Sequence, residues 1–152
     1  MRMDKLTSKF QLAIADAQSL VIGRDHQFIE PIHILFALLD QEGGNTRHLL
    51  SNANVNVNQL RSQLGVALDK LPTVQGVNGD IHLSNDLIRL FNVCDKLSQT
   101  RRDKYISSEL FILAGVKDKG TVGSLLNAAG ATEAVLETAI EQMRGGEKVV
   151  DP

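Results

Sequence analysis

Four histidines are the first residues to test for metal or acid–base chemistry: His26, His33, His48 and His82. Only His26 and His33 lie near each other, seven residues apart across an expected helix start, and no further ligand lies at a typical metal-site spacing. Because structural and catalytic metal sites need three or four such side chains, we expect no metal. Surface or helix-capping histidines are the better interpretation.

The single cysteine, Cys94, shares a helical spacing with Leu87, Leu90 and Leu97. A thiol on an apolar stripe is typical of a small core residue and not of a nucleophile, which needs a polar surrounding that lowers its pKa. A lone cysteine also excludes an internal disulfide.

Segment 115–121, Gly-Val-Lys-Asp-Lys-Gly-Thr, has the outline of a phosphate-binding loop. The lysine that should follow the second glycine is absent, and no strand is predicted before the segment. The sequence also lacks G-x-S-x-G and H-E-x-x-H motifs. We therefore expect no cofactor in this chain, neither binding nor hydrolysis of ATP, and no enzyme activity.

The charge balance argues against nucleic acid and anionic membranes as partners. The chain has 152 residues, with 16 Lys and Arg against 18 Asp and Glu, both spread evenly along the sequence. A basic footprint is therefore not expected, and aromatic residues are too few, at 4% without Trp, for a base-stacking platform. The longest apolar run, 34–39, is far short of a membrane span, and the N-terminus does not resemble a secretory signal. We expect a cytoplasmic protein.

Apolar residues recur at steps of three or four throughout, which predicts an all-α fold. The first helix carries Leu6, Phe10, Ala13, Ala17 and Leu20; a second begins at Pro31 and ends before Gly43; a short third covers 47–51; a fourth opens at Asn56. Residues 71–83 contain a proline, two glycines and no helical period, and so predict a linker. The helical pattern restarts at Ser84, an expected N-cap.

The restart is a weak internal repeat. Ala17-Gln18-Ser19-Leu20 matches Cys94-Asp95-Lys96-Leu97, and Phe28-Ile29 matches Tyr105-Ile106, both at an offset of 77 residues. Segment 49–54 matches 125–130 at 76. The chain therefore predicts two pseudo-twofold repeats of a four-helix unit, about 5–70 and 84–144, with about eight helices in all.

An ordered series of segments resembles the N-terminal domain of the ClpB-type protein disaggregases of the AAA+ Clp family. The series runs over nearly the whole chain, and its members are 5–13, 15–20, 27–35, 37–39, 94–97, 106–111, 128–131 and 140–146. The resemblance implies a Clp N-terminal domain over residues 1–146. It also implies that residues 147–152 begin a linker to ATPase modules that this chain does not contain.

The resemblance implies a function as well. The domain would be a stress-response chaperone's substrate-recognition part, binding unfolded or aggregated polypeptides before an ATP-driven ring threads them. The implied parent is a homohexamer that uses ATP and magnesium in its absent modules and works with a DnaK-type chaperone, whereas the isolated domain would be a monomer. The alternative is a docking module for a folded adaptor protein, as Clp-type N-domains also dock adaptors.

Five residues are candidates for substrate binding by resemblance: Thr7, Phe91, Asp103, Glu109 and Leu110. Periodicity alone slightly favours a core position for Phe91, but the family's apolar patch uses this position, often with leucine, together with Leu110. We therefore expect Phe91 and Leu110 to line an exposed apolar groove. Local chemistry gives the polar three structural explanations: a helix cap for Thr7, a favourable helix dipole for Glu109 and an ion pair with Arg101-Arg102 for Asp103.

Overall fold

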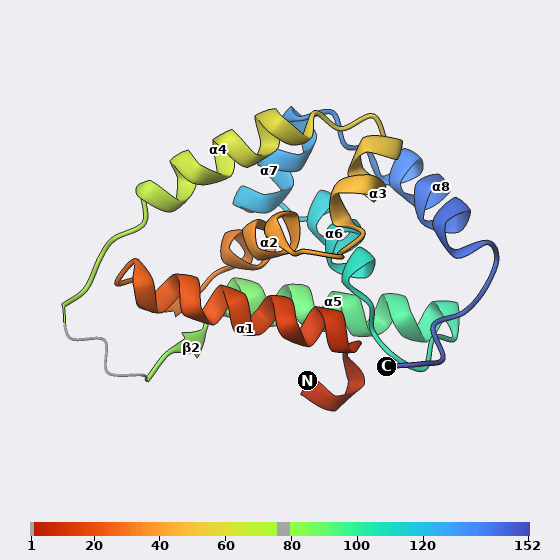
Figure 1. Ribbon diagram of the computed structural model, residues 1–152, viewed down its shortest axis with the longest axis horizontal. Helices are drawn as coiled ribbons and strands as arrows, with labels where there is room; N and C mark the ends of the chain where they lie inside the picture. Colours follow the sequence, from red (N-terminus) through yellow and green to blue (C-terminus); the bar gives the residue numbers. More distant parts are fainter. Residues whose placement is uncertain (1, 76–79) are drawn as a thin grey trace.

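The structure is a computed structural model that describes residues 2–75 and 80–152 (Figure 1). Residues 76–79 of the predicted linker lie outside the described residues. The first four α-helices are α1 (Ser8–Gly23), α2 (Pro31–Asp40), α3 (Thr46–Asn52) and α4 (Val57–Asp69). The second four are α5 (Asn85–Arg101), α6 (Ser108–Val116), α7 (Thr121–Ala128) and α8 (Glu133–Arg144). A short 3-10 helix, η1 (Met3–Lys5), precedes them. The all-α prediction is confirmed.

Equivalent helices begin with equivalent caps. The hydroxyl of Thr7 accepts a hydrogen bond from the Phe10 N–H before α1, and that of Ser84 accepts one from the Leu87 N–H before α5. Asn56 and Thr132 cap α4 and α8 in the same way. These side chains satisfy amide groups that have no partner within their own helix, which fixes where each helix begins.

Short backbone segments of the two repeats pair with each other. Strands β1 (Phe28–Ile29) and β2 (His82–Leu83) pair in parallel and align Ile29 with Leu83. A single parallel bridge joins Leu6 to Ile106. Leu6 and Leu83 are 77 residues apart, as are Ile29 and Ile106, so each bridge is the pseudo-twofold counterpart of the other. Within residues 2–75 and 80–152, this two-stranded pair is the one regular departure from the helix-only expectation.

Three phenylalanines join the repeats in the core. Phe10 of the first repeat lies 6.0 Å from Phe91 and 6.2 Å from Phe111 between ring centroids, and the rings of Phe91 and Phe111 are also 6.2 Å apart. The edge-to-face and tilted arrangements suit the quadrupoles of aromatic rings. Further out, α3 packs against α8 and α4 against α7, so the later helices also contact the other repeat (Figure 1). Cys94 is buried as expected, and burial raises the pKa of its thiol.

A buried pair of histidines lies at the start of α2. The backbone N–H of Glu30 donates to Nδ1 of His33 at 2.9 Å, and Nε2 of His33 lies 2.8 Å from Nδ1 of His26. Since Nδ1 of His33 must accept, its proton is assigned to Nε2, which donates to His26. Both rings are almost fully buried. The interpretation of His33 as a capping histidine is therefore confirmed, whereas a surface position is wrong for this pair.

The histidine pair should make stability depend on pH. Burial, with a smaller contribution from His26, lowers the pKa of His33 from its usual 6.5 to about 4. His33 is harder to protonate in the folded state than in the unfolded state. The stability that neutral His33 contributes is therefore complete above pH 6.5 and is lost as the pH falls towards 4. We expect a loss of about 3 kcal/mol in unfolding free energy over this window. Urea unfolding at several pH values measures it.

A matched pair of variants isolates the source of this dependence. His33→Gln keeps an acceptor for the Glu30 N–H but cannot titrate, so the slope should flatten. His48→Gln replaces an exposed histidine and should leave the slope unchanged. Equal slopes in both variants would contradict the assignment.

Candidate functional site

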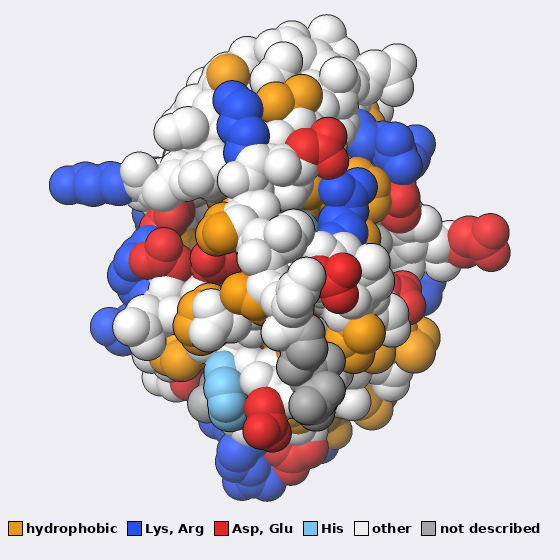
Figure 2. All heavy atoms as spheres, turned by 90° about the vertical axis from the view of Figure 1, so that its left-hand side faces the viewer, with side chains coloured by type: hydrophobic (Ala, Val, Ile, Leu, Met, Phe, Trp, Pro, Cys, Tyr) orange, Lys and Arg blue, Asp and Glu red, His pale blue; other side chains and the backbone are white. Residues whose placement is uncertain are grey.

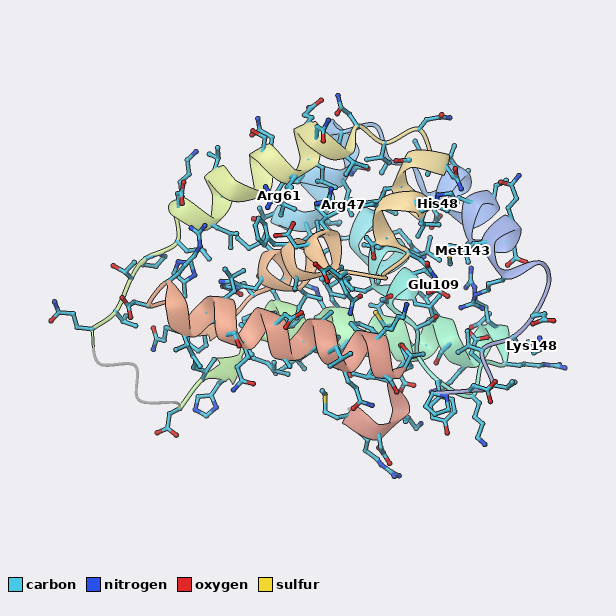
Figure 3. All side chains as sticks on the ribbon, in the orientation of Figure 1. Arg47, His48, Arg61, Glu109, Met143 and Lys148 are labelled. Atoms are coloured by element: carbon cyan, nitrogen blue, oxygen red, sulfur yellow. The ribbon has the colours of Figure 1, made fainter. Side chains whose placement is uncertain are left out.

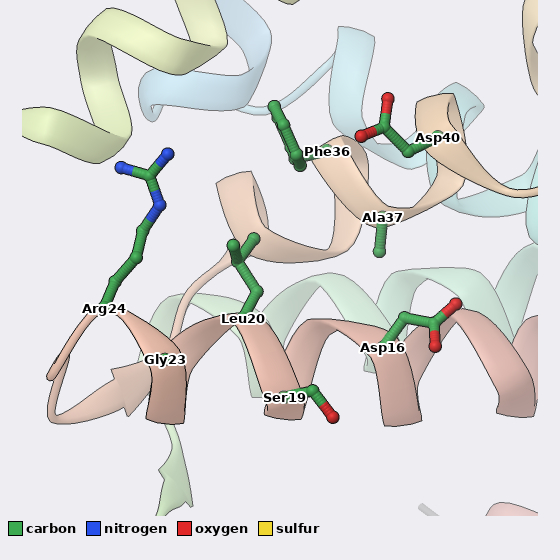
Figure 4. A pocket seen from close by; sticks show the side chains of 8 residues that line it. All are labelled: Asp16, Ser19, Leu20, Gly23, Arg24, Phe36, Ala37 and Asp40. Atoms are coloured by element: carbon green, nitrogen blue, oxygen red, sulfur yellow. The ribbon is translucent and has the colours of Figure 1, made fainter.

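A groove of about 440 Å³ lies between α1 and α2 (Figure 4). Its walls are mainly apolar, and its volume is within the range of about 300–1,000 Å³ that is typical of ligand pockets. In Figure 4 the side chain of Leu20 reaches from α1 towards α2, whereas the Phe36 ring points away from α1, and both residues are partly buried. The complete lining is Asp16, Ser19, Leu20, Gly23, Arg24, Phe36, Ala37 and Asp40.

Small residues create the groove. A Cβ atom at Gly23 would meet no atom within 4 Å, and Ala37 contributes only a methyl group to the opposite wall. The lining residues of α1 recur at steps of three and four, so they share one face of that helix. The helix pair therefore packs closely elsewhere but leaves a hollow where two side chains are small.

Ion pairs frame the groove at both ends. Asp40 receives two hydrogen bonds from Arg61 of α4, at 2.9 and 3.0 Å, and a third at 3.3 Å from Arg47 of α3. Figure 3 shows both arginines reaching towards the end of α2. The hydrogen bond from Arg61 holds the pKa of the Asp40 carboxyl below its usual range, and the same guanidinium lies 5.0 Å from the centroid of the Phe36 ring. At the other end, Arg24 pairs with Asp69 of α4 at 2.8 Å.

The two predicted apolar anchors do not line an exposed groove. Phe91 is only 3% exposed and Leu110 is 0% exposed, so the expectation of surface exposure was wrong. Phe91 is buried because α5 also contacts the first repeat, where Phe10 meets its ring. Leu110 is in the first turn of α6, but this turn is enclosed by the core and not by solvent. A direct role in substrate binding stays an untested prediction for both.

The three polar candidates lie around the loop between α5 and α6. Thr7 is a helix cap, as its structural explanation required, and its N–H donates to Ile106. Asp103 pairs with Arg144 of α8 at 3.0 Å and not with Arg101 or Arg102, so the expected local ion pair was wrong. Glu109 pairs with the same guanidinium at 3.0 Å. Their roles in substrate handling stay predictions.

The Arg144 cluster is almost completely dehydrated. The side chain of Arg144 is 8% exposed, that of Asp103 0% and that of Glu109 10%. Ser107 completes the cluster: it donates to Glu109 at 2.6 Å and accepts from Arg144 at 3.1 Å. The cluster joins the end of α8 to the α5–α6 loop. Within the described residues, no three His, Cys, Asp or Glu side chains gather in a way that could hold a metal ion.

Comparison with known families identifies this arrangement. The family described as the Clp repeat (R) N-terminal domain matches residues 5–129. The chain belongs to this family of Clp N-domains. It is 58% identical over 152 residues to the chaperone protein ClpB of Vibrio cholerae serotype O1, covering 100% of this chain and 18% of that protein. With the ClpB of Pseudomonas putida it shares 48% over 151 residues, 99% of this chain and 18% of the relative.

Solved structures share the fold of this Clp N-domain. The Hsp104 N-terminal domain from Candida albicans superposes with a TM-score of 0.84 at 18% identity, covering 97% of this chain and 96% of that one. A ClpV N-domain in complex with a VipB peptide gives 0.76 at 22% identity, with 95% and 89% coverage. At these identities the likeness shows the fold alone.

Sequence reasoning missed the groove and the role of Arg144. The groove depends on where side chains are absent, and helical periodicity records only where apolar side chains are present. Arg144 is 41 residues from Asp103 and 35 from Glu109, so no local pattern links them. The available signal was the position of a basic residue in the last turn of the Clp N-domain's final helix.

Removing Arg144 should strongly destabilise the Clp N-domain. Arg144→Ala leaves two buried carboxylates without their partner, and we expect a loss of about 3–5 kcal/mol in unfolding free energy. Arg24→Ala breaks a solvent-exposed pair of the same charge type and should cost about 0–1 kcal/mol. Urea denaturation compares the two. Similar losses would mean that the cluster is not a structural centre.

Truncating Phe91 should also destabilise the fold. Phe91→Ala opens a cavity among three aromatic rings, and we expect a loss of about 3–5 kcal/mol. Ile88→Ala on the same helix removes a side chain that is 44% exposed and should cost much less. Thermal unfolding followed by circular dichroism measures both changes. A nearly unchanged melting temperature for Phe91→Ala would restore the exposed-groove interpretation.

Proposed function

We propose that this Clp N-domain is the substrate-recognition domain of a ClpB-type disaggregase and binds exposed apolar segments of unfolded or aggregated proteins. The partly exposed apolar residues Leu20 and Phe36 in the α1–α2 groove are the observation that carries the proposal. Identity of 58% with a ClpB chaperone supports this function over other functions of the fold. The chain spans 18% of that relative, so ATP-driven threading is a proposal about the parent protein.

The groove suits weak and promiscuous binding. Its apolar walls can accept different aliphatic or aromatic side chains, and full burial of one such side chain contributes about 1.5–3 kcal/mol. Micromolar affinity requires about 8 kcal/mol in total, so one anchor alone binds weakly. A machine that passes its substrate onward needs such easy release.

Four further statements about the parent protein and the isolated domain depend on this proposed function. We infer a homohexameric parent protein, cooperation with a DnaK-type chaperone, a cytoplasmic location and a catalytically inactive isolated domain. The 58% identical ClpB relative supports these statements as a group. No helix among the described residues is both long and apolar enough to cross a lipid bilayer.

Adaptor docking is the second candidate. A ClpV N-domain of the same fold is known in complex with a VipB peptide, which supports defined peptide partners for such domains. Charged residues at the rim of the groove, Asp16 and Arg24, would suit one complementary partner. Saturable one-to-one binding to a single folded protein, with no binding of unfolded polypeptide, would favour this candidate.

The groove is tested by changing its apolar wall. Leu20→Ser should weaken binding of reduced, carboxymethylated α-lactalbumin about tenfold, the effect of losing about 1.4 kcal/mol of apolar contact. Leu12→Ser is the matched control, because Leu12 is on the same helix, is 60% exposed and does not line the groove. Fluorescence anisotropy with the labelled polypeptide measures both affinities.

A second variant protects the test against loss of the fold. Gly23→Leu places a side chain in open space within the groove and should block it without steric damage. If both Leu20→Ser and Gly23→Leu fold and bind as the unmodified domain does, the groove is not the substrate site.

A further inference from the structure

The segment that follows α8 turns back onto the domain. Gly145 and Gly146 have φ values of +60° and +81°, in the left-handed region that glycine adopts without strain. The chain thereby reverses and runs across the loop between α5 and α6 towards the N-terminus of α1 (Figure 1). We call residues 146–152 the return segment.

Main-chain hydrogen bonds hold the return segment. The N–H groups of Lys104 and Tyr105 donate to the carbonyl oxygen of Val149 at 2.7 and 3.3 Å. The N–H of Val149 donates to Oδ1 of Asp103 at 3.1 Å. Two donors and one acceptor thus surround a single residue of extended chain.

The acceptor is fixed in advance. Asp103 has a fully buried side chain and is held by Arg144, so its oxygen is oriented before the return segment arrives. Lys148 points its amine to the carbonyl oxygen of Arg101 at 3.1 Å, but the lysine itself is exposed (Figure 3). Val149 is partly buried and Val150 is exposed. Recognition therefore rests on the backbone and hardly on side-chain identity.

The first repeat also holds its own chain at the corresponding loop, but through a different group. After α4 the chain returns to the loop between α1 and α2, where the Val74 N–H donates to the carbonyl oxygen of Asp25 at 2.8 Å. Val74 and Val149 occupy corresponding places, each a few residues beyond the fourth helix of its repeat. Both repeats thus hold the chain beyond their fourth helix at this loop, the first through one carbonyl oxygen and the second through a carboxylate and two N–H groups.

We propose that Asp103, Lys104 and Tyr105 form a second polypeptide-binding site, which accepts one extended peptide unit of any sequence. In the structure residues 148–149 of the chain itself fill this site, and an extended segment of an unfolded client protein competes with them. Backbone pairing of an extended segment gives affinity without sequence preference. The identity of the competing ligand rests on the proposed function of the domain.

Competition sets the expected size of the effect. A site that its own segment fills nine-tenths of the time binds an outside ligand about tenfold more weakly than an empty site. Releasing the return segment should therefore raise the affinity of this site for a client. The intrinsic affinity of the α1–α2 groove should stay the same.

Two proline variants of the full chain test the proposal. Val149→Pro removes the N–H that Asp103 accepts. Val150→Pro is the matched control, because the Val150 N–H has no hydrogen-bond partner in the part of the chain that the structure describes. Hydrogen exchange followed by NMR should show the Lys104 and Tyr105 amides exchanging at least about tenfold faster in Val149→Pro than in Val150→Pro, as expected for loss of a hydrogen bond to a charged group.

Client binding is then measured on the same variants. Reduced, carboxymethylated α-lactalbumin should shift the amide signals of Lys104 and Tyr105, with a dissociation constant about tenfold lower for Val149→Pro than for Val150→Pro. Equal amide exchange in the two variants would overturn the docking of the return segment. Faster exchange without any client-induced shift at Lys104 and Tyr105 would overturn the competition.

The NMR experiment tests the two proposed sites separately. Shifts at Leu20 and Phe36 report the groove, and shifts at Lys104 and Tyr105 report the α5–α6 loop. Shifts at the first pair alone would leave the proposed function standing and remove the second site. Shifts at neither pair would contradict both.

Discussion

Each repeat pairs a backbone N–H at the start of its first helix with a carbonyl oxygen of the other repeat. The N–H of Thr7 donates to the carbonyl oxygen of Ile106, and the N–H of Ser84 donates to that of Ile29, both at 3.0 Å. Thr7 and Ser84 are also the caps that begin α1 and α5. Each such hydrogen bond contributes about 0.5–1.5 kcal/mol, so each repeat stabilises the start of the other's first helix. The reciprocal bridges thus place the repeats around one pseudo-twofold axis, and the contact of Phe10 with Phe91 and Phe111 follows from that placement.

The two repeats use the same positions for different polar chemistry. His26 of the first repeat corresponds to Asp103 of the second, 77 residues later. In the first repeat the position belongs to a buried neutral pair that helps to begin α2. In the second it belongs to a buried ionic cluster that binds α8 and faces the return segment. The repeat therefore keeps its backbone while one copy gains a charged, oriented acceptor, which is what an extended peptide N–H requires.

Local chemistry made the helices predictable but not the sites. Ser84, Asn56 and Pro31 act within a few residues of themselves, so the sequence located the helix starts near them. The burial of Phe91 could not be predicted, because this residue lies beside the buried stripe of α5. Such a residue is buried only if a side chain of the other repeat packs against it, and the sequence does not show that contact. The pairing of Asp103 with Arg144 depends on the same long-range packing. The groove at Gly23 and Ala37 was unpredictable for a further reason: it results from missing side-chain volume.

The positions of the two proposed sites on α1 suit an extended client. The groove uses Leu20 and Gly23 near the end of this helix, whereas the return segment reaches its start, where the Ser8 N–H donates to the carbonyl oxygen of Pro152 at 2.6 Å. Twelve helical residues between Ser8 and Leu20 span about 18 Å, a distance that five or six extended residues cover. A client segment that reached both sites would have a raised effective concentration at the second once it is bound at the first. Two weak contacts then retain an unfolded chain that neither would hold alone, and each still releases it readily.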